Sequence, residues 1–179
     1  MFFFRAVRNH SHFKSESFDL EQAKQWLMDR DGERTSFYRV DDLEMANRVA
    51  IIYVMFGKLQ PEQTSFVLII DQIINQLVNE FDVTIHETPS DIAHRLLRET
   101  HREIGGLRSL EVREALARRI ADHPGCLKER IHPKARTMGM LACREIDDPE
   151  SGHEAASLIA GKIKWEQMIA EARRIPPPS

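Results

Sequence analysis

The chain has 179 residues, of which 42% are hydrophobic and 30% charged, and its formal net charge at pH 7 is −3. This balance is that of an ordinary globular protein, and a chain of this length buries about two thirds of its unfolded surface without needing a disulfide. The longest apolar run, residues 49–56, is far shorter than the ~18 residues of a membrane span, so we expect a soluble, cytoplasmic protein with no membrane segment.

Three short segments have the composition of β-strands. Residues 1–7 and 35–40 combine aromatic and β-branched side chains, and residues 82–86 form a third candidate. Because all three are short, they predict one small sheet if they pair.

Capping residues predict two helices in the N-terminal part of the chain. Asp19 and Gln22 form a capping box at the start of the first helix. Asp41 and Glu44 form another at the start of the second helix, which Gly57 ends. Both helices have an apolar face that we expect to be buried.

A longer helix is predicted over residues 62–81, with Pro61 suited to its first turn. Apolar side chains recur through this segment at helical spacing, so we expect it at the centre of the fold. Its remaining stripe consists mainly of amides. Such a stripe suits either a solvated face or a contact between subunits, and a homo-oligomer formed through the 62–81 helix is therefore a hypothesis.

The C-terminal half predicts a helical hairpin and a last helix. Helices over 91–104 and 109–122 are joined by a Gly-Gly turn, and Ser151 and Glu154 form the capping box of the last helix. The intervening stretch, 122–145, has no clean hydrophobic period and is interpreted as a connector.

Together these elements predict a mainly α fold of about six helices with a small N-terminal β element, which becomes α+β if the short strands pair. We expect residues 1–150 to form a single helical domain with that small sheet. Residues 151–175 would be a C-terminal helix that packs on this domain or extends as an arm, and residues 176–179 a disordered tail.

Charge is distributed unevenly along the chain. Residues 1–90 and 137–179 have balances of −5 and −2, whereas residues 91–136 have a balance of +4. The candidate partner-binding residues lie within this basic segment and are Arg95, Arg98, Arg102, Arg108, Arg113, Arg118 and Arg119. Guanidinium groups bind carboxylates bidentately, so we expect a non-enzymatic interaction or regulatory module that docks this Arg-rich helical face on an acidic protein partner. Glutamates at helical spacing between these arginines offer the other interpretation, a solvated face with internal ion pairs.

A nucleic-acid-binding protein is the alternative hypothesis, because the basic segment 91–136 also suits phosphates. Zinc would staple this segment if the two cysteines and two of the histidines converge. The candidate ligands are His123, Cys126, His132 and Cys143. Two sulfurs and two imidazoles form a permissible tetrahedral set, although their spacing departs from that of zinc fingers. We favour the other interpretation, a buried cysteine pair with surface histidines. No other cofactor is predicted.

A HEPN-like helical ribonuclease is the second alternative. Arg95 and His101 have the Arg-x5-His spacing of such enzymes, and Arg118 and His123 match a variant of it, as chance allows in an Arg-rich segment. The chain has no P-loop, no G-x-S-x-G and no HExxH motif. We therefore favour a protein without catalytic activity and assign no catalytic residue.

Overall fold

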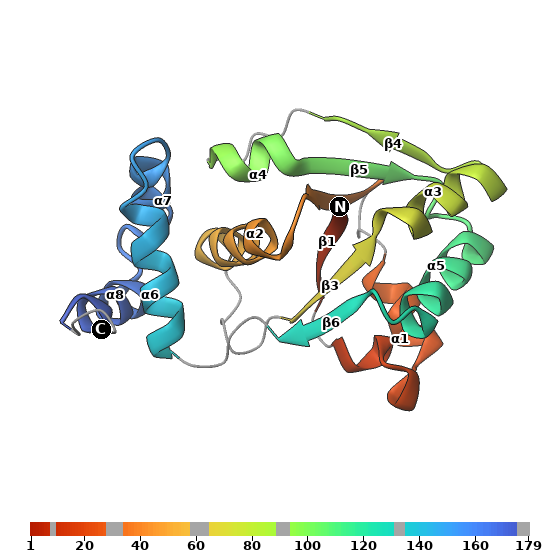
Figure 1. Cartoon of the computed structure of the whole chain (residues 1–179), viewed down its shortest axis with the longest axis horizontal. Coiled ribbons are helices and arrows are strands. Elements are labelled where there is room, and N and C mark those ends of the chain that lie inside the picture. Colours follow the sequence, from red (N-terminus) through yellow and green to blue (C-terminus); the bar gives the residue numbers. More distant parts are fainter. Residues whose placement is uncertain (8–9, 28–33, 58–64, 89–93, 131–134, 175–179) are drawn as a thin grey trace.

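The computed structural model describes residues 1–7, 10–27, 34–57, 65–88, 94–130 and 135–174. At its centre is a six-stranded sheet with the strand order β4-β5-β2-β1-β3-β6, in which every neighbouring pair is antiparallel (Figure 1). The strands are β1 (Phe2–Val7), β2 (Arg34–Val40), β3 (Ser65–Ile70), β4 (Thr84–His86), β5 (His101–Gly105) and β6 (Leu127–Arg130). The prediction of a mainly α fold with a small β element is therefore wrong, and the fold is α+β.

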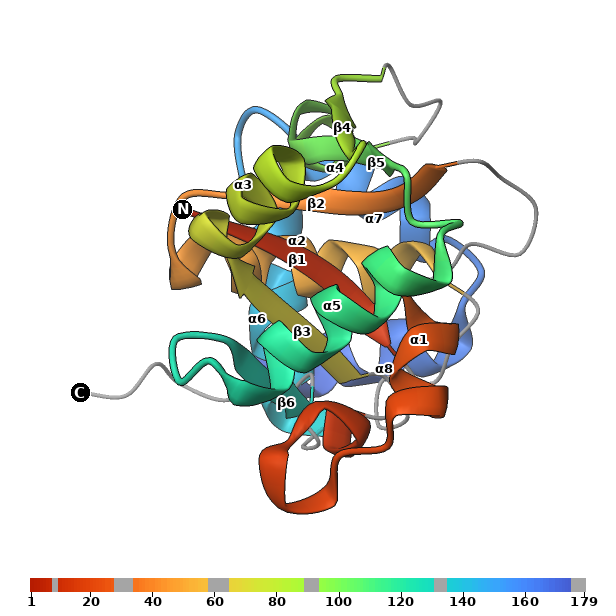
Figure 2. The same ribbon diagram turned by 90° about the vertical axis from the view of Figure 1, so that its right-hand side faces the viewer.

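Helices cover both faces of this sheet. They are α1 (Leu20–Trp26), α2 (Leu43–Phe56), α3 (Asp71–Glu80), α4 (Arg95–Thr100), α5 (Leu110–Asp122), α6 (Ala135–Ile146), α7 (Gly152–Ile159) and α8 (Ile163–Arg173). Two short 3-10 helices, His10–Phe13 and Ser15–Ser17, precede α1. Figure 2 shows α1, α3 and α5 in front of the sheet, whereas α2 lies behind it with α6, α7 and α8.

Strand alternation divides the apolar side chains into two cores. Successive residues of a strand point to opposite faces, so Phe3 and Phe4 of β1 enter different cores although both are fully buried. Phe4 packs with Tyr38 against α2, and Phe3 packs with Phe37 beneath α1, α3 and α5. These two cores hold the helices of each face against the sheet.

The helix predicted over 62–81 is wrong in its first part. Ser65–Ile70 is strand β3, which lies inside the sheet between β1 and β6, and helix α3 begins only at Asp71. Its apolar residues are buried on both faces of the sheet, so the run shows no alternation. A short continuous apolar run cannot be assigned to strand or helix by periodicity. Pro61 lies outside the described residues.

The predicted helical hairpin is also wrong. Among the described residues of the predicted helix 91–104, Arg95–Thr100 is helical, whereas His101–Gly105 is strand β5, which pairs with β2 and β4. The turn after it places Gly106 at a φ of +87°, where a Cβ would meet the carbonyl oxygen of Asp82. The Gly-Gly turn therefore joins a strand to α5 instead of joining two helices.

The stretch 122–145 contains β6 and most of α6, so it is not only a connector. The C-terminal segment forms two helices, α7 and α8, with Gly161 between them at a φ of +74°. Trp165, Met168 and Ile169 of α8 are buried in the same core as α2, so this segment packs on the domain. Residues 176–179 lie outside the described residues. None of the helices in the described part combines the length and apolar character needed to cross a bilayer.

Candidate functional site

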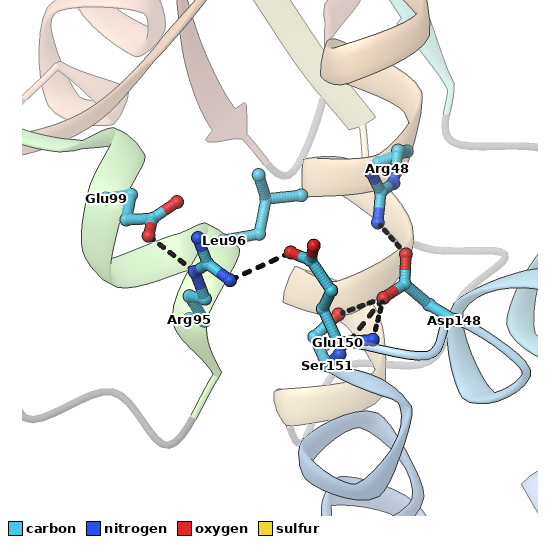
Figure 3. A pocket seen from close by; sticks show the side chains of 7 residues that line it. All are labelled: Arg48, Arg95, Leu96, Glu99, Asp148, Glu150 and Ser151. Atoms are coloured by element: carbon cyan, nitrogen blue, oxygen red, sulfur yellow. Dashed lines mark hydrogen bonds and ion pairs between the residues drawn. The ribbon is translucent and has the colours of Figure 1, made fainter.

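Three adjoining hollows in the surface surround the N-terminal half of α2. The first is lined by Arg48, Arg95, Leu96, Glu99, Asp148, Glu150 and Ser151 (Figure 3). It shares Arg48 with a second hollow between α2 and α6, and it shares Leu96 and Glu99 with a third at the end of β2. The side chains of the first hollow come from α2, α4 and the segment between α6 and α7, so tertiary structure alone brings them together.

Arg48 is the central cation of this site. Its Nε and Nη2 donate to the two carboxylate oxygens of Glu145 on α6, each at 2.9 Å, and Nη2 also donates to Asp148 at 3.1 Å. The hydrogen bond that Arg48 donates to Glu145 is the main reason why the pKa of Arg48 is raised above its usual value. A bidentate guanidinium–carboxylate pair is short and geometrically specific, so it fixes α2 against α6.

Asp148 organises the turn before α7. Its Oδ1 accepts hydrogen bonds from the backbone N–H groups of Glu150 and Ser151, at 2.9 and 3.0 Å, and from the Ser151 hydroxyl at 3.2 Å. These backbone donors, with Arg48, hold the pKa of Asp148 below its usual value. The carboxylate is therefore charged at neutral pH and ties the turn to α2.

Helix α4 is fastened to α7 by a second set of ion pairs. Arg95 lies between Glu99 and Glu150, at 2.6 and 2.9 Å (Figure 3), and Arg98 pairs with Glu154 at 2.9 Å. Glu154 also accepts the backbone N–H of Arg95 at 2.5 Å. Burial raises the pKa of Glu154, but this N–H and the Arg98 guanidinium outweigh burial and leave that pKa below its usual value.

Glu154 was predicted to cap the last helix, yet it caps α4 instead. The guanidinium and carboxylate groups of this site neutralise one another across four helical segments. Such an arrangement holds helices in place, and the hydrogen bonds of Figure 3 leave each charge satisfied by another group of the same protein.

The seven predicted partner-binding arginines do not share one face. Arg95 and Arg98 lie on α4, Arg102 lies on strand β5, and the remaining four lie on α5 or just before it. Leu97 of α4 is buried in the core beside α2, whereas α5 covers the opposite face of the sheet. Figure 1 shows these two helices at separate edges of the molecule. The helical stripe of Arg95, Arg98 and Arg102 is therefore not formed.

Most of these arginines contact the protein's own carboxylates or carbonyls. Arg102 pairs with Glu87 at 3.0 Å, Arg118 pairs with Glu114 at 2.8 Å, and Arg119 pairs with Glu80. Arg113 donates to the carbonyl oxygen of Arg108 at 3.3 Å. The pairs differ in exposure, which decides how easily a partner competes for them.

The candidate zinc ligands are not brought together. Cys126 is buried in the core beneath α5, whereas Cys143 of α6 packs against the core on the other face of the sheet. Burial raises the pKa of both thiols. His123 ends α5, where its Nδ1 accepts the N–H of Gly125 at 3.0 Å, and His132 lies outside the described residues. Among the described residues, no cluster of three or more His, Cys, Asp or Glu side chains has the geometry of a metal site.

Arg95 and His101, the candidate ribonuclease pair, belong to different elements. His101 is the first residue of β5, is only 6% exposed, and packs its ring against Tyr38 at 5.7 Å. Arg95 lies on the exposed side of α4. The sequence spacing between them does not correspond to a shared helical face.

An apolar hollow on the opposite side of the sheet was missed by the sequence reasoning. It lies where the end of α3 meets the start of α5, and its lining is Phe81, Leu110, Glu111, Glu114, Ala115 and Arg118. Leu110 is 56% exposed although it is a large apolar residue. The sequence contained an indication of this, because Val112, Leu116 and Ile120 define the inner face of α5 and leave Leu110 outside it.

The fold and these sites define an α+β protein with a central antiparallel sheet, a charged junction on one side and an exposed apolar hollow on the other. Comparison of the chain with protein-family models, curated proteins and solved structures finds no match.

Proposed function

We propose that the protein is a non-enzymatic interaction or regulatory protein that docks an acidic protein partner on the α3–α5 face. The observation that supports this proposal is the apolar hollow that Leu110 and Arg118 line. The Leu110 residue is 56% exposed. An apolar centre with a polar rim is the usual anatomy of a protein interface. Leu110 is the exposed large apolar side chain of this hollow, and Phe81 and Ala115 beside it are half-buried. An exposed apolar side chain set in an apolar hollow favours a binding role.

Charge favours an acidic partner at this face. Residues 108–119 hold four arginines and two glutamates, so the helix that borders the hollow has a basic balance. The Arg118–Glu114 pair is i,i+4 on one helix, with side chains 54% and 39% exposed. Such a pair contributes about 0.3–0.5 kcal/mol, so a carboxylate of the partner can displace Glu114 at little cost.

The arginines of α4 are less suited to docking. Arg98 pairs with Glu154, whose side chain is only 18% exposed, and Arg95 is held by two carboxylates. A partner would have to break this junction before it met a guanidinium group. We therefore place the docking residues of the basic segment on α5.

The test is a comparison of proteins captured from a native lysate by the unmodified chain and by three variants. Leu110→Asp and Arg118→Glu change the proposed face, and Ile163→Asp changes a residue of α8 that is 68% exposed on the opposite side of the sheet. We expect one set of proteins to be lost with both face variants and retained with Ile163→Asp. All three changes are at exposed positions, so the thermal midpoints should differ by no more than a few degrees.

If Leu110→Asp and Arg118→Glu captured the same proteins as the unmodified chain, the α3–α5 face would not be the docking surface.

Titration with generic DNA and RNA at two salt concentrations tests the alternative of a nucleic-acid-binding protein. Binding to phosphates would weaken steeply as the salt concentration increases. A cytoplasmic location and a homo-oligomer formed through α3, whose amides Gln72, Asn75, Gln76 and Asn79 are exposed, stay predictions.

A further inference from the structure

His94 occupies an unusual position for an ionisable group. Its side chain is completely buried, at the N-cap of α4. Among the residues that the structure describes, the charged groups that act on it are Arg48 of α2, Arg98 of α4, Glu145 of α6 and Glu154 of α7. A single buried imidazole thus lies close to charged groups of four helices.

The hydrogen bonds define the protonation state of this ring. Nδ1 accepts the backbone N–H of Leu96 at 3.2 Å, so Nδ1 carries no proton. The neutral ring therefore carries its proton on Nε2, and Nε2 is buried without a hydrogen-bond partner among the described residues. The site accepts a neutral imidazole and satisfies only one of its two nitrogens.

A second proton on this ring would break the cap. Protonated Nδ1 cannot accept from Leu96, and its N–H would face the N–H of Leu96. A cation at a helix N-terminus is also disfavoured by the helix dipole. Because α4 has only six residues, the loss of this cap affects a large part of the helix.

The neighbouring charges do not compensate for this loss. Glu145 and Glu154 attract an imidazolium, but each is already engaged by a guanidinium group, Arg48 and Arg98 respectively. Those two cations repel an imidazolium. Burial is the dominant influence, and it lowers the pKa of His94 below 6.5.

We propose that His94 is a pH-sensitive latch whose protonation releases the N-terminal part of α4 from α7 and from the turn before α7. Release would uncover Leu97, which is fully buried in the core beside α2, and would separate Arg98 from Glu154. The latch lies on the other side of the sheet from the proposed docking face, so the two proposals are independent.

The sign of the pH dependence follows from linkage. With a pKa below 6.5 in the closed state, the closed form binds fewer protons than the open form once the pH falls below 6.5. The stability contributed by neutral His94 is therefore complete above that pH. This stability decreases as the pH falls from 6.5 toward the pKa of the closed state. Over that range the opening equilibrium constant increases by up to about tenfold per pH unit.

Hydrogen–deuterium exchange of the α4 amides at pH 7.5 and 5.5, corrected for intrinsic rates, tests the latch. We expect the opening equilibrium of Arg98–Thr100 to increase by up to about tenfold at the lower pH while the α5 amides stay protected. In His94→Asn the change should fall below about twofold, because Asn keeps the cap acceptor but does not titrate. His86→Asn, on strand β4, is the matched control and should retain the full response.

An equal pH response in His94→Asn would overturn the latch, and so would unchanged exchange of α4 in the unmodified protein. The second measurement needs no variant, so the proposal stays testable even if His94→Asn does not fold. A loss of protection in α5 together with α4 would indicate global acid unfolding and would also count against a local latch.

Discussion

Arg48 and Glu145 face each other across the contact between α2 and α6, with two N–H···O hydrogen bonds of 2.9 Å between guanidinium and carboxylate. The Glu145 side chain is 3% exposed, whereas that of Arg48 is 32% exposed. They are 97 residues apart in the chain. This pair links the helix that packs on the sheet to the outer helices, and its asymmetric burial leads to the first prediction.

Replacing Arg48 by Met should destabilise the protein by about 2–4 kcal/mol, because Glu145 would remain as a buried carboxylate without its main partner. Breaking a fully buried pair costs about 3–5 kcal/mol, and the partial exposure of Arg48 reduces this. The double change Arg48→Met with Glu145→Leu should recover most of the loss. Urea unfolding at neutral pH measures both values.

Arg144→Met is the control for Arg48→Met. Arg144 pairs with Glu44, and their side chains are 63% and 65% exposed, so its loss should cost less than about 1 kcal/mol. If Arg48→Met cost no more than Arg144→Met, the buried pair would have no special role in joining α2 to α6.

Proline at the start of α3 distinguishes the observed strand and helix from a continuous helix over 62–81. Asp71 is the first residue of α3, and Ile70 before it is extended, with φ −63° and ψ 142°. Proline is favoured at a first helical position after an extended residue, so Asp71→Pro should cost about 1 kcal/mol, mainly through the lost contacts of Asp71 with Met1 and Arg39.

Asn75→Pro, in the middle of α3, should cost about 3 kcal/mol or more. In a continuous helix both positions would be interior, and both variants would be equally disruptive. Thermal unfolding followed by circular dichroism compares the two, with Asp71→Ala as the measure of side-chain loss alone.

The crossing of α6 and α8 depends on a glycine. A Cβ at Gly139 would lie 2.4 Å from the carbonyl oxygen of Met168, so the two helices cannot approach as they do with any larger residue. Gly139→Ala should therefore destabilise the protein by about 1–3 kcal/mol, although alanine has the higher helix propensity. Denaturant unfolding checks this value.

Met140→Ala provides the comparison on the same helix. Met140 is 46% exposed, so its truncation should change stability by less than about 0.5 kcal/mol. A stabilising Gly139→Ala would indicate that helix propensity outweighs the close approach, and that α8 does not contact α6 as described.

Helix caps and strand composition allowed several elements to be predicted from the sequence. Asp19 accepts the N–H of Gln22, and Ser109 accepts the N–H of Val112, as capping predicts, because a cap acts within three residues of itself. The strands predicted from composition at residues 1–7 and 35–40 correspond to β1 and β2. At α2 the cap is Asp42, one residue beyond the predicted Asp41.

Strand pairs and ion pairs between segments that are distant in the chain could not be predicted from the sequence. Ser65–Ile70 is a strand because β1 and β6 lie on either side of it, and those segments are far from it in the chain. Glu154 was predicted to cap its own helix, but it binds Arg95 and Arg98, more than 50 residues away. The local sequence of an apolar run or around a carboxylate does not identify the distant segment that it contacts. Only the tertiary structure therefore shows whether the run forms a strand and which groups the carboxylate binds.

The sequence by itself determined, to within one residue, where α1, α2 and α5 begin. It also determined which side chains are apolar enough to form a core, and that residues 91–136 are basic. Tertiary structure decided which apolar runs pair as strands, because sheet hydrogen bonds join segments distant in the chain. It also decided that the arginines of α4 and α5 lie on opposite sides of the sheet. Charge composition is a property of a segment, whereas a binding surface depends on which faces of several segments meet solvent together.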